Sequence, residues 1–223
     1  MVIKYEASLH NFNLIPGSRF SYWCTNFSIF SFSKLSEFYV SGGRNKTHNN
    51  ELFLRNWWEV VPSIKWQPYA NGGDFRRWYG NNLEVVNWSN EAKSFCDSHG
   101  GLYNKIFWGK EGLCWNLITS YKNSFRFKSA DFHYSSASPT IISNDSKLDK
   151  CVLGFLNTEL VVNILQILNP TLSTTVSDVL NLPFEMKDNK EKINLIVQDN
   201  IKIAKDDWDS FETSWDFKKH PLL

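Results

Sequence analysis

Residues 65–88 read KWQPYANGGDFRRWYGNNLEVVNW and are the most informative stretch of this chain. The stretch holds three Trp, two Tyr, two adjacent Arg, four Asn and three Gly. Aromatic residues favour strands and Asn-Gly-Gly favours a turn, so the stretch predicts a twisted antiparallel hairpin that turns at residues 71–73. Guanidinium groups beside aromatic rings also suit a surface that stacks on flat groups and binds anions. Nucleic acid offers both.

The composition around this stretch is that of a globular chain rich in aromatic residues. The 223 residues are 42% hydrophobic and 16% aromatic, with ten Trp, and can form one domain with or without an appendage. The four Cys form no CxxC pair, and no secretory signal opens the chain, which predicts free thiols in a reducing, cytoplasmic setting. The longest apolar stretch, residues 151–168, is interrupted by polar residues and predicts a buried helix, with no role in a membrane.

The net charge of +1 conceals an asymmetry along the chain. Residues 42–134 hold twelve Lys and Arg against eight Asp and Glu, whereas residues 178–216 hold five against ten. The basic part coincides with the aromatic part, as expected of a surface that contacts phosphates. A solvated face of mixed charge is the alternative interpretation.

Apolar periodicity predicts helices at three places. Residues 51–61 fit a short amphipathic helix. Residues 149–168 predict one long helix whose buried stripe consists of residues 153, 156, 160, 164 and 168. Residues 188–205 predict another helix, although residues 201–203 could continue as a strand.

The remaining pattern is mainly that of strands and hairpins between residues 62 and 145. Within it, residues 121–142 contain two strand-like stretches, FRFK and FHYS. Residues 27–32 fit a short strand or an irregular aromatic segment equally well. The predicted class is therefore α+β, with a twisted, mainly antiparallel sheet backed by a long buried helix and followed by a helical C-terminal tail.

This pattern divides the chain into three segments. Residues 1–61 are expected to be an N-terminal lead-in segment packed on the domain. Residues 62–186 are expected to form the core, and residues 187–223 a helical, acidic tail.

The sequence lacks the motifs of known catalytic sites. It contains no Asn-Pro-Pro-Tyr, no FxGxG or GxGxxG turn, no GK[ST] loop, no GxSxG elbow and no HExxH helix. Cys96 and His99 have a spacing compatible with a metal and stand in the same part of the chain as Cys114. However, a structural zinc site requires a second pair. We therefore predict no catalytic residue, no metal ligand and no cofactor-binding residue in this chain.

Several stretches together resemble one protein family in a constant order. Besides residues 65–88 they are IPGS at 15–18 with YW at 22–23, KTHNN at 46–50 with FLR at 53–55 and WEV at 58–60, EGLCW at 111–115 with SFRF at 124–127, LGFLN at 153–157 with LNPTL at 168–172, and DWDSFE at 207–212 with SWDF at 214–217. The chain thereby resembles the PglX family, the adenine-specific DNA methyltransferases of BREX phage-defence systems, which are similar to type IIG restriction-modification enzymes. His48-Asn49 stands where the family usually has Gly-Asp, and Ser18-Arg19 where Ser-Pro is common.

The resemblance implies the C-terminal target-recognition region of such a methyltransferase, because the family's catalytic core is absent from this sequence. Whether the chain is itself an enzyme is left open, and S-adenosylmethionine is expected only in the full-length family. Duplex DNA is the implied partner, held by basic groups on its phosphates and by amide and aromatic groups at base edges. The candidate contacts are Arg44, Lys46, Asn49, Arg76, Arg77, Trp78, Tyr79, Asn81, Asn82, Lys122, Arg126 and Lys128.

Two further expectations remain open at this point. A methyltransferase catalytic domain or other defence-system subunits would be protein partners, and the chain could instead be a protein-interaction module that docks on one of them through its aromatic surface. If Arg76 and Arg77 lie on a strand, their side chains face opposite sides of it. One would then face the DNA, and the other would pair within the domain.

Overall fold

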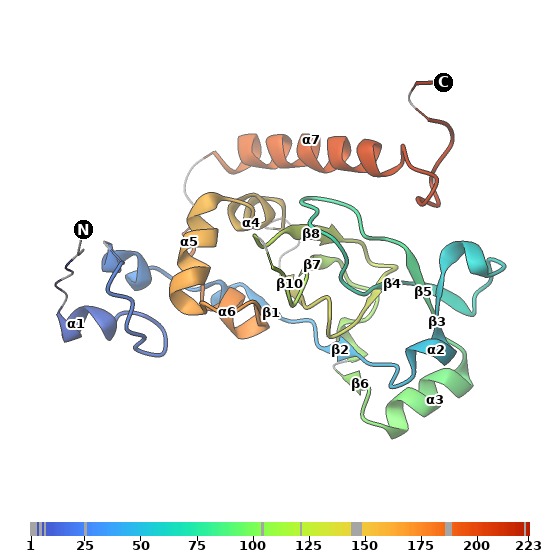
Figure 1. Ribbon diagram of the computed structural model, residues 1–223, viewed down its shortest axis with the longest axis horizontal. Helices are drawn as coiled ribbons and strands as arrows, with labels where there is room; N and C mark the ends of the chain where they lie inside the picture. Colours follow the sequence, from blue (N-terminus) through green and yellow to red (C-terminus); the bar gives the residue numbers. More distant parts are fainter. Residues whose placement is uncertain are drawn as a thin grey trace.

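The computed structural model describes the chain except for residues 1–3, 5, 7, 25, 104, 121, 144–148, 186–188 and 221, and the side chains of residues 44 and 149. In this described part, strands form two four-stranded sheets and one two-stranded ribbon (Figure 1). Helices α4 to α6 cover one end of the strands, and α7 runs along one side of the molecule (Figure 1). The α+β class with mainly antiparallel pairing is confirmed.

The first sheet has the strand order β1-β10-β7-β8, and all its pairs are antiparallel. Its strands are β1 (Tyr39–Ser41), β10 (Thr140–Ser143), β7 (Gly112–Trp115) and β8 (Phe125–Lys128). Strand β8 confirms the first of the two strands expected in residues 121–142, of which residue 121 lies outside the described part. Leu113, Trp115 and Phe125 of this sheet are fully buried in the main hydrophobic core.

The second sheet has the strand order β3-β5-β4-β9. Its strands are β3 (Leu54–Asn56), β5 (Glu84–Asn87), β4 (Trp66–Ala70) and β9 (His133–Tyr134), and only the β4–β9 pair is parallel. Strand β9 confirms the second expected strand. A ribbon of β2 (Arg44–Asn45) and β6 (Leu102–Tyr103) lies beside this sheet, through a bridge between Asn45 and Ser135.

The helices follow local capping and apolar periodicity. The α-helices are α1 (Leu9–Phe12), α2 (Asn50–Phe53), α3 (Asn90–Ser98), α4 (Asp149–Leu156), α5 (Glu159–Leu168), α6 (Val176–Leu180) and α7 (Lys190–Trp208). Short 3-10 helices span Phe27–Ser31, Leu35–Glu37, Trp57–Glu59 and Lys105–Phe107. The first of them shows that residues 27–31 are not a strand, and α3 is a helix in the region where we expected mainly strands.

Helix α7 confirms the helix predicted for residues 188–205, whose first residue lies outside the described part. It continues through residues 201–203 to Trp208, so the alternative strand does not form. Val197 and Trp208 are its buried side chains, and α7 packs on α4.

The single helix predicted for residues 149–168 is wrong, because the chain breaks between α4 and α5 and bends by 69°. The Asn157 amide donates to the Phe125 carbonyl at 3.0 Å and accepts from the Phe125 N–H at 3.1 Å, which ties the break to β8. Thr158 then caps α5 through the Val161 N–H. The break shifts the helical phase, so that Val161 is buried whereas Leu160 is 50% exposed.

The helix predicted for residues 51–61 is also wrong. Asn49 caps only one turn, by accepting from the Leu52 N–H at 3.0 Å. The chain then enters β3, where Leu54 lies opposite Val86 of β5. Pairing with a neighbouring strand buries Leu54 and overrides the local helical periodicity.

Residues 65–88 form the predicted antiparallel pair of β4 and β5, but without a tight turn at residues 71–73. The strands are joined by residues 71–83, which we call the signature loop. Arg76 and Arg77 therefore lie in a loop, and the expected alternation of their side chains along a strand does not apply. Gly80 has a φ of +122°, which an L side chain rarely adopts.

Among the described residues no single helix is both long and apolar enough to cross a membrane, and α4 with α5 meet that test only as a bent pair.

Candidate nucleic-acid interface

Three adjoining cavities form a row beside the second sheet, which we call the polar groove. The first, of about 400 Å³, is lined by signature-loop residues together with Asn56, Glu84, Trp208 and Thr213. The second, of about 490 Å³, is lined by residues 45–48 and by Asn50, Tyr69, Asn71, Ser135, Ser136 and Ala137. The third, of about 450 Å³, is lined by Ser41, Gly43, Tyr103, Leu117, Ser135, Ser136, Pro139, Thr175 and Val176.

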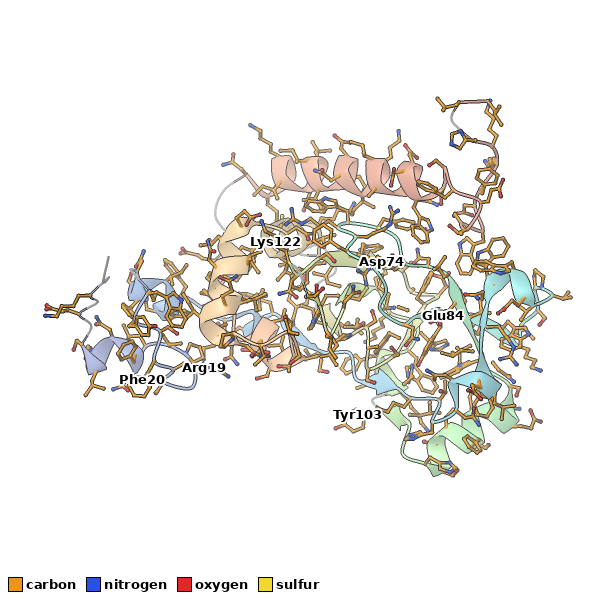
Figure 2. All side chains as sticks on the ribbon, in the orientation of Figure 1. Arg19, Phe20, Asp74, Glu84, Tyr103 and Lys122 are labelled. Atoms are coloured by element: carbon orange, nitrogen blue, oxygen red, sulfur yellow. The ribbon has the colours of Figure 1, made fainter. Side chains whose placement is uncertain are left out.

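Shared residues join the three cavities. Asn71 lines the first and the second, while Ser135 and Ser136 line the second and the third. Asp74 and Glu84 line the first cavity, and Tyr103 of the β2–β6 ribbon lines the third; Figure 2 labels these three side chains. Amide and hydroxyl groups dominate the residues between these ends, so the polar groove offers many hydrogen-bond donors and acceptors.

Burial shifts the pKa of two side chains that line the polar groove. Burial raises the pKa of the Glu84 carboxyl, while a hydrogen bond from Asn71 partly opposes the shift. Burial also raises the pKa of Tyr69, whose hydroxyl donates to the Asn45 carbonyl at 2.7 Å. Tyr69 therefore stays a neutral donor that fixes β4 to the β2–β6 ribbon.

Arg76 is held by the C-terminal end of α7. Its Nη1 lies 2.8 Å from the Asp207 carboxylate, and its guanidinium carbon lies 4.9 Å from the centre of the Trp208 ring and 6.0 Å from that of Phe211. Arg76 and Trp208 both line the first cavity of the polar groove. The basic signature loop and the acidic C-terminal part of the chain therefore meet at this cavity.

The next three candidates of the signature loop contact the body of the protein. Arg77 lies 3.9 Å from the Glu159 carboxylate and over the Phe75 ring. Trp78 has a φ of +72°, exchanges backbone hydrogen bonds with β8 and packs against the main core. Tyr79 lies under the Lys205 ammonium at 5.1 Å, and burial raises its pKa.

Asn81 and Asn82 help to shape the signature loop itself. The Asn81 amide donates to the Asp74 carbonyl at 2.8 Å, across the loop. The Asn82 side chain hydrogen-bonds to the Tyr79 hydroxyl. Both residues line a further cavity of about 470 Å³ that lies between the signature loop, β8 and the C-terminal segment.

Residues 44–49 form a polar loop that lines the second cavity of the groove. Lys46 is exposed, and its backbone N–H donates to Gly101. Asn49 is exposed but uses its amide oxygen as the cap of α2. Arg44 lies in β2, and its side chain is outside the described part of the structure.

The remaining candidates do not line the polar groove, although Arg126 and Lys128 line the adjoining cavity of about 470 Å³, which shares Gly72 and Asn81 with the first. Lys122 pairs with Glu159 at 2.8 Å, beside α5 (Figure 2). Arg126 is 3% exposed and donates to Asn116 at 2.8 Å. Lys128 is also 3% exposed, and its ammonium donates to the carbonyls of Lys110, Ser129 and Phe132. Burial lowers the pKa of Lys128 to about 8.

The structure adds groove residues that the sequence analysis missed. Asn45, Asn56 and Asn71 line the groove from three separate elements, and Ser135 and Ser136 form its central wall. Asn71 belongs to residues 65–88, so the sequence could have identified its amide as a candidate. No sequence pattern pointed to Ser135 and Ser136, because only the pairing of β9 with β4 brings them to the groove.

No metal site forms from the residues that the structure describes, since no three His, Cys, Asp or Glu side chains among them gather closely enough. Cys96 is buried near the Thr47 carbonyl, His99 is exposed beside Phe95, and Cys114 lies in β7. Cys24, Cys96, Cys114 and Cys151 are free thiols.

The chain is similar in sequence to two adenine-specific methyltransferases. No protein-family model matches the chain. The chain is 31% identical over 245 residues to the adenine-specific methyltransferase PglX of Lacticaseibacillus casei (strain Zhang), and the match covers 98% of the chain and 20% of that protein. It is 29% identical over 233 residues to the adenine-specific methyltransferase BrxX of Escherichia coli O9:H4 (strain HS), covering 98% of the chain and 19% of the relative. The resemblance to the PglX family is thereby confirmed, and the chain spans about a fifth of the length of these relatives.

Proposed function

On the premise of that similarity, we propose that this chain recognises duplex DNA for a site-specific adenine methyltransferase of a phage-defence system. The catalytic domain and the S-adenosylmethionine site would lie in protein outside the matched fifth. The polar groove carries the proposal, because it joins the polar loop 44–49 and the signature loop, which the sequence separates, along one row of cavities. Both loops hold residues that the family resemblance and residue chemistry together had suggested for DNA.

The groove offers the two kinds of contact that DNA recognition needs. Lys46 and Arg76 provide cations for phosphates, which fix the register of a duplex. The Asn71 amide and the Ser136 hydroxyl provide donors and acceptors suited to base edges. We assign Arg126 and Lys128 a structural role and no contact with DNA, because both are buried and their charged groups donate to protein acceptors.

Fluorescence anisotropy with a labelled duplex tests this function. We expect non-specific dissociation constants on the order of 10⁻⁴–10⁻⁶ M that weaken steeply as salt rises. Lys46→Ala should weaken binding and reduce the slope of log affinity against log salt by about 1, as loss of one phosphate contact requires. Lys192→Ala, which removes the same charge from α7, is the matched control and should leave that slope unchanged.

Two results would contradict the proposal. The first is no binding at low salt at ten times the expected concentration range. The second is an equal effect of Lys46→Ala and Lys192→Ala, because a general loss of positive charge would then explain both variants.

A second candidate function is docking on another protein of the defence system. It is favoured by exposed apolar side chains of the N-terminal segment, which lies at one end of the molecule beyond α5 (Figure 2). These side chains are those of Leu9, Phe20, Tyr22, Trp23 and Phe32, each at least 42% exposed. A contact through these side chains would change little with salt, whereas DNA binding would fall, so the same salt series separates the two functions.

A further inference from the structure

The guanidinium of Arg76 is oriented by two groups that act differently on it. Its guanidinium carbon lies over the Trp208 ring at 4.9 Å and over the Phe211 ring at 6.0 Å, and the Asp207 carboxylate pairs with it at 2.8 Å. A ring below a guanidinium holds it in place but leaves its N–H edge free for an anion. The carboxylate occupies that edge. Arg76 is therefore arranged as an anion site that the chain fills with its own Asp207.

The ion pair is accessible to solvent and to competing anions. The Arg76 side chain is 30% exposed, and that of Asp207 is 60% exposed. Pairs of such exposure contribute little to stability, because water and salt screen them. A phosphate diester can therefore replace the carboxylate at small cost, and the charge-assisted bonds of Arg to phosphate are as well directed as those to a carboxylate.

The location of the pair connects it with the polar groove. Arg76, Trp208 and Thr213 all line the first cavity, so an anion that replaces Asp207 would lie at the groove. The backbone around the pair is close-packed, since a Cβ on Gly80 would lie 2.7 Å from the Arg76 Cδ and 3.1 Å from the Trp208 ring. The Trp57 indole also donates to the Thr213 carbonyl at 2.8 Å, which holds the C-terminal segment against η3, the 3-10 helix Trp57–Glu59. The contacts that position the Arg76 guanidinium therefore remain when the Asp207 carboxylate leaves it.

We propose that Arg76 is a phosphate contact of the polar groove and that Asp207 occupies it in the absence of nucleic acid. This inference rests on the proposed function and adds a regulatory element to it. Binding a duplex exchanges the Arg76–Asp207 pair for an Arg76–phosphate pair, so the acidic end of α7 weakens binding. The other cation of this region behaves differently, because Lys205 is held by both Asp209 and Asp216 and lies over Tyr79.

The test compares two substitutions that remove the same charge from adjacent positions. Asp207→Asn frees the guanidinium while keeping the size of the side chain, and Asp206→Asn is the control, because Asp206 is exposed on the same turn of α7. Anisotropy with a 20-base-pair duplex of arbitrary sequence should show about two- to five-fold tighter binding for Asp207→Asn than for Asp206→Asn, in keeping with the modest strength of an exposed pair. The salt slope of Asp207→Asn should not fall below that of the wild type.

A double substitution identifies the site of the effect. In the Arg76→Ala background, Asp207→Asn and Asp206→Asn should bind equally, since no guanidinium is left to release. Millimolar inorganic phosphate should displace the duplex only weakly from either Asp variant, because a diester chain contacts several groups together. Complete displacement of the duplex by millimolar phosphate would show a site for free phosphate and overturn the assignment to nucleic acid.

The outcomes separate this inference from the proposed function. If the wild type binds DNA and Lys46→Ala weakens it, but the two Asp variants are equal, only the role of Asp207 is wrong. Weaker binding by Asp207→Asn than by Asp206→Asn also overturns it, since Asp207 would then orient Arg76 for DNA instead of competing with it. If neither the wild type nor any variant binds DNA, the proposed function is wrong, and the role of Arg76 and Asp207 that rests on it is wrong as well.

Discussion

The two four-stranded sheets are both built from short strands in mainly antiparallel pairing, yet they are packed very differently. Strands β7, β8 and β10 bury Leu113, Trp115, Phe125 and Ile141 completely in one core with α4, α5 and α6. The second sheet holds only small clusters, one around Val86 and another of residues 70, 132 and 134. The other residues of the second sheet and its loops contribute mainly amide and hydroxyl groups to the cavities of the polar groove. The first sheet therefore serves as a scaffold, and the second sheet, with its loops, forms the candidate interface.

Removing Trp115 should have the largest effect, because it belongs to the scaffold. Its side chain is fully buried, and its indole N–H donates to the Thr174 carbonyl at 2.8 Å. Trp115→Ala should lower the free energy of unfolding by about 3–5 kcal/mol. Urea denaturation followed by circular dichroism measures this loss. The matched change Trp88→Ala in the half-buried aromatic group of the second sheet should cost clearly less. Equal losses would mean that the two sheets share one core.

Acid should weaken the second sheet before the first. The His133 ring of β9 lies tilted against the Trp88 ring with their centres 4.0 Å apart, and burial lowers its pKa to about 4. Because the folded pKa lies below the unfolded value of about 6.5, the unfolded chain binds more protons between these values. Stability is therefore complete above pH 6.5 and falls as the pH approaches 4, by about 2 kcal/mol at pH 5.

Tryptophan fluorescence and circular dichroism distinguish a local effect of acid from a global one. In the wild type the fluorescence of the Trp88 environment should change at a higher pH than the far-ultraviolet signal. His133→Phe keeps an aromatic ring against Trp88 and has no titrating group, so it should remove this part of the pH dependence. An unchanged pH profile in that variant would assign the acid sensitivity to other groups.

A smaller effect is expected where the signature loop meets α7. Gly80→Ala places a Cβ at positive φ and within 3.1 Å of the Trp208 ring, and should cost about 1–2 kcal/mol and open the loop to proteolysis. Gly100→Ala is the control, because Gly100 also has a positive φ but a Cβ there would meet nothing within 4 Å. If Gly100→Ala costs as much, the contact with Trp208 adds nothing to the backbone strain.

Much of the fold was predictable from local pattern. The apolar period of α7, the strand-like FRFK and FHYS stretches and the pairing within residues 65–88 were all found as expected. The period of α7 and the pairing of β4 with β5 arise from residues that are near in the chain, whereas β9 was recognisable from its residue types although it pairs with the distant β4. Residue chemistry also pointed to Lys46, Arg76 and Asn81, but it placed the buried Arg126 and Lys128 in the same group. Exposure depends on neighbours that periodicity does not show.

The sequence by itself determined which groups the chain could offer: the aromatic and guanidinium-rich loop, the basic middle, the acidic end and the absence of catalytic motifs. Only the tertiary structure decided how these groups meet. The helix breaks at Asn157 because its amide bonds to Phe125, 32 residues away, and Arg76 is occupied by a carboxylate 131 residues further along the chain. Such contacts form when packing brings distant segments together, and no local pattern encodes that proximity.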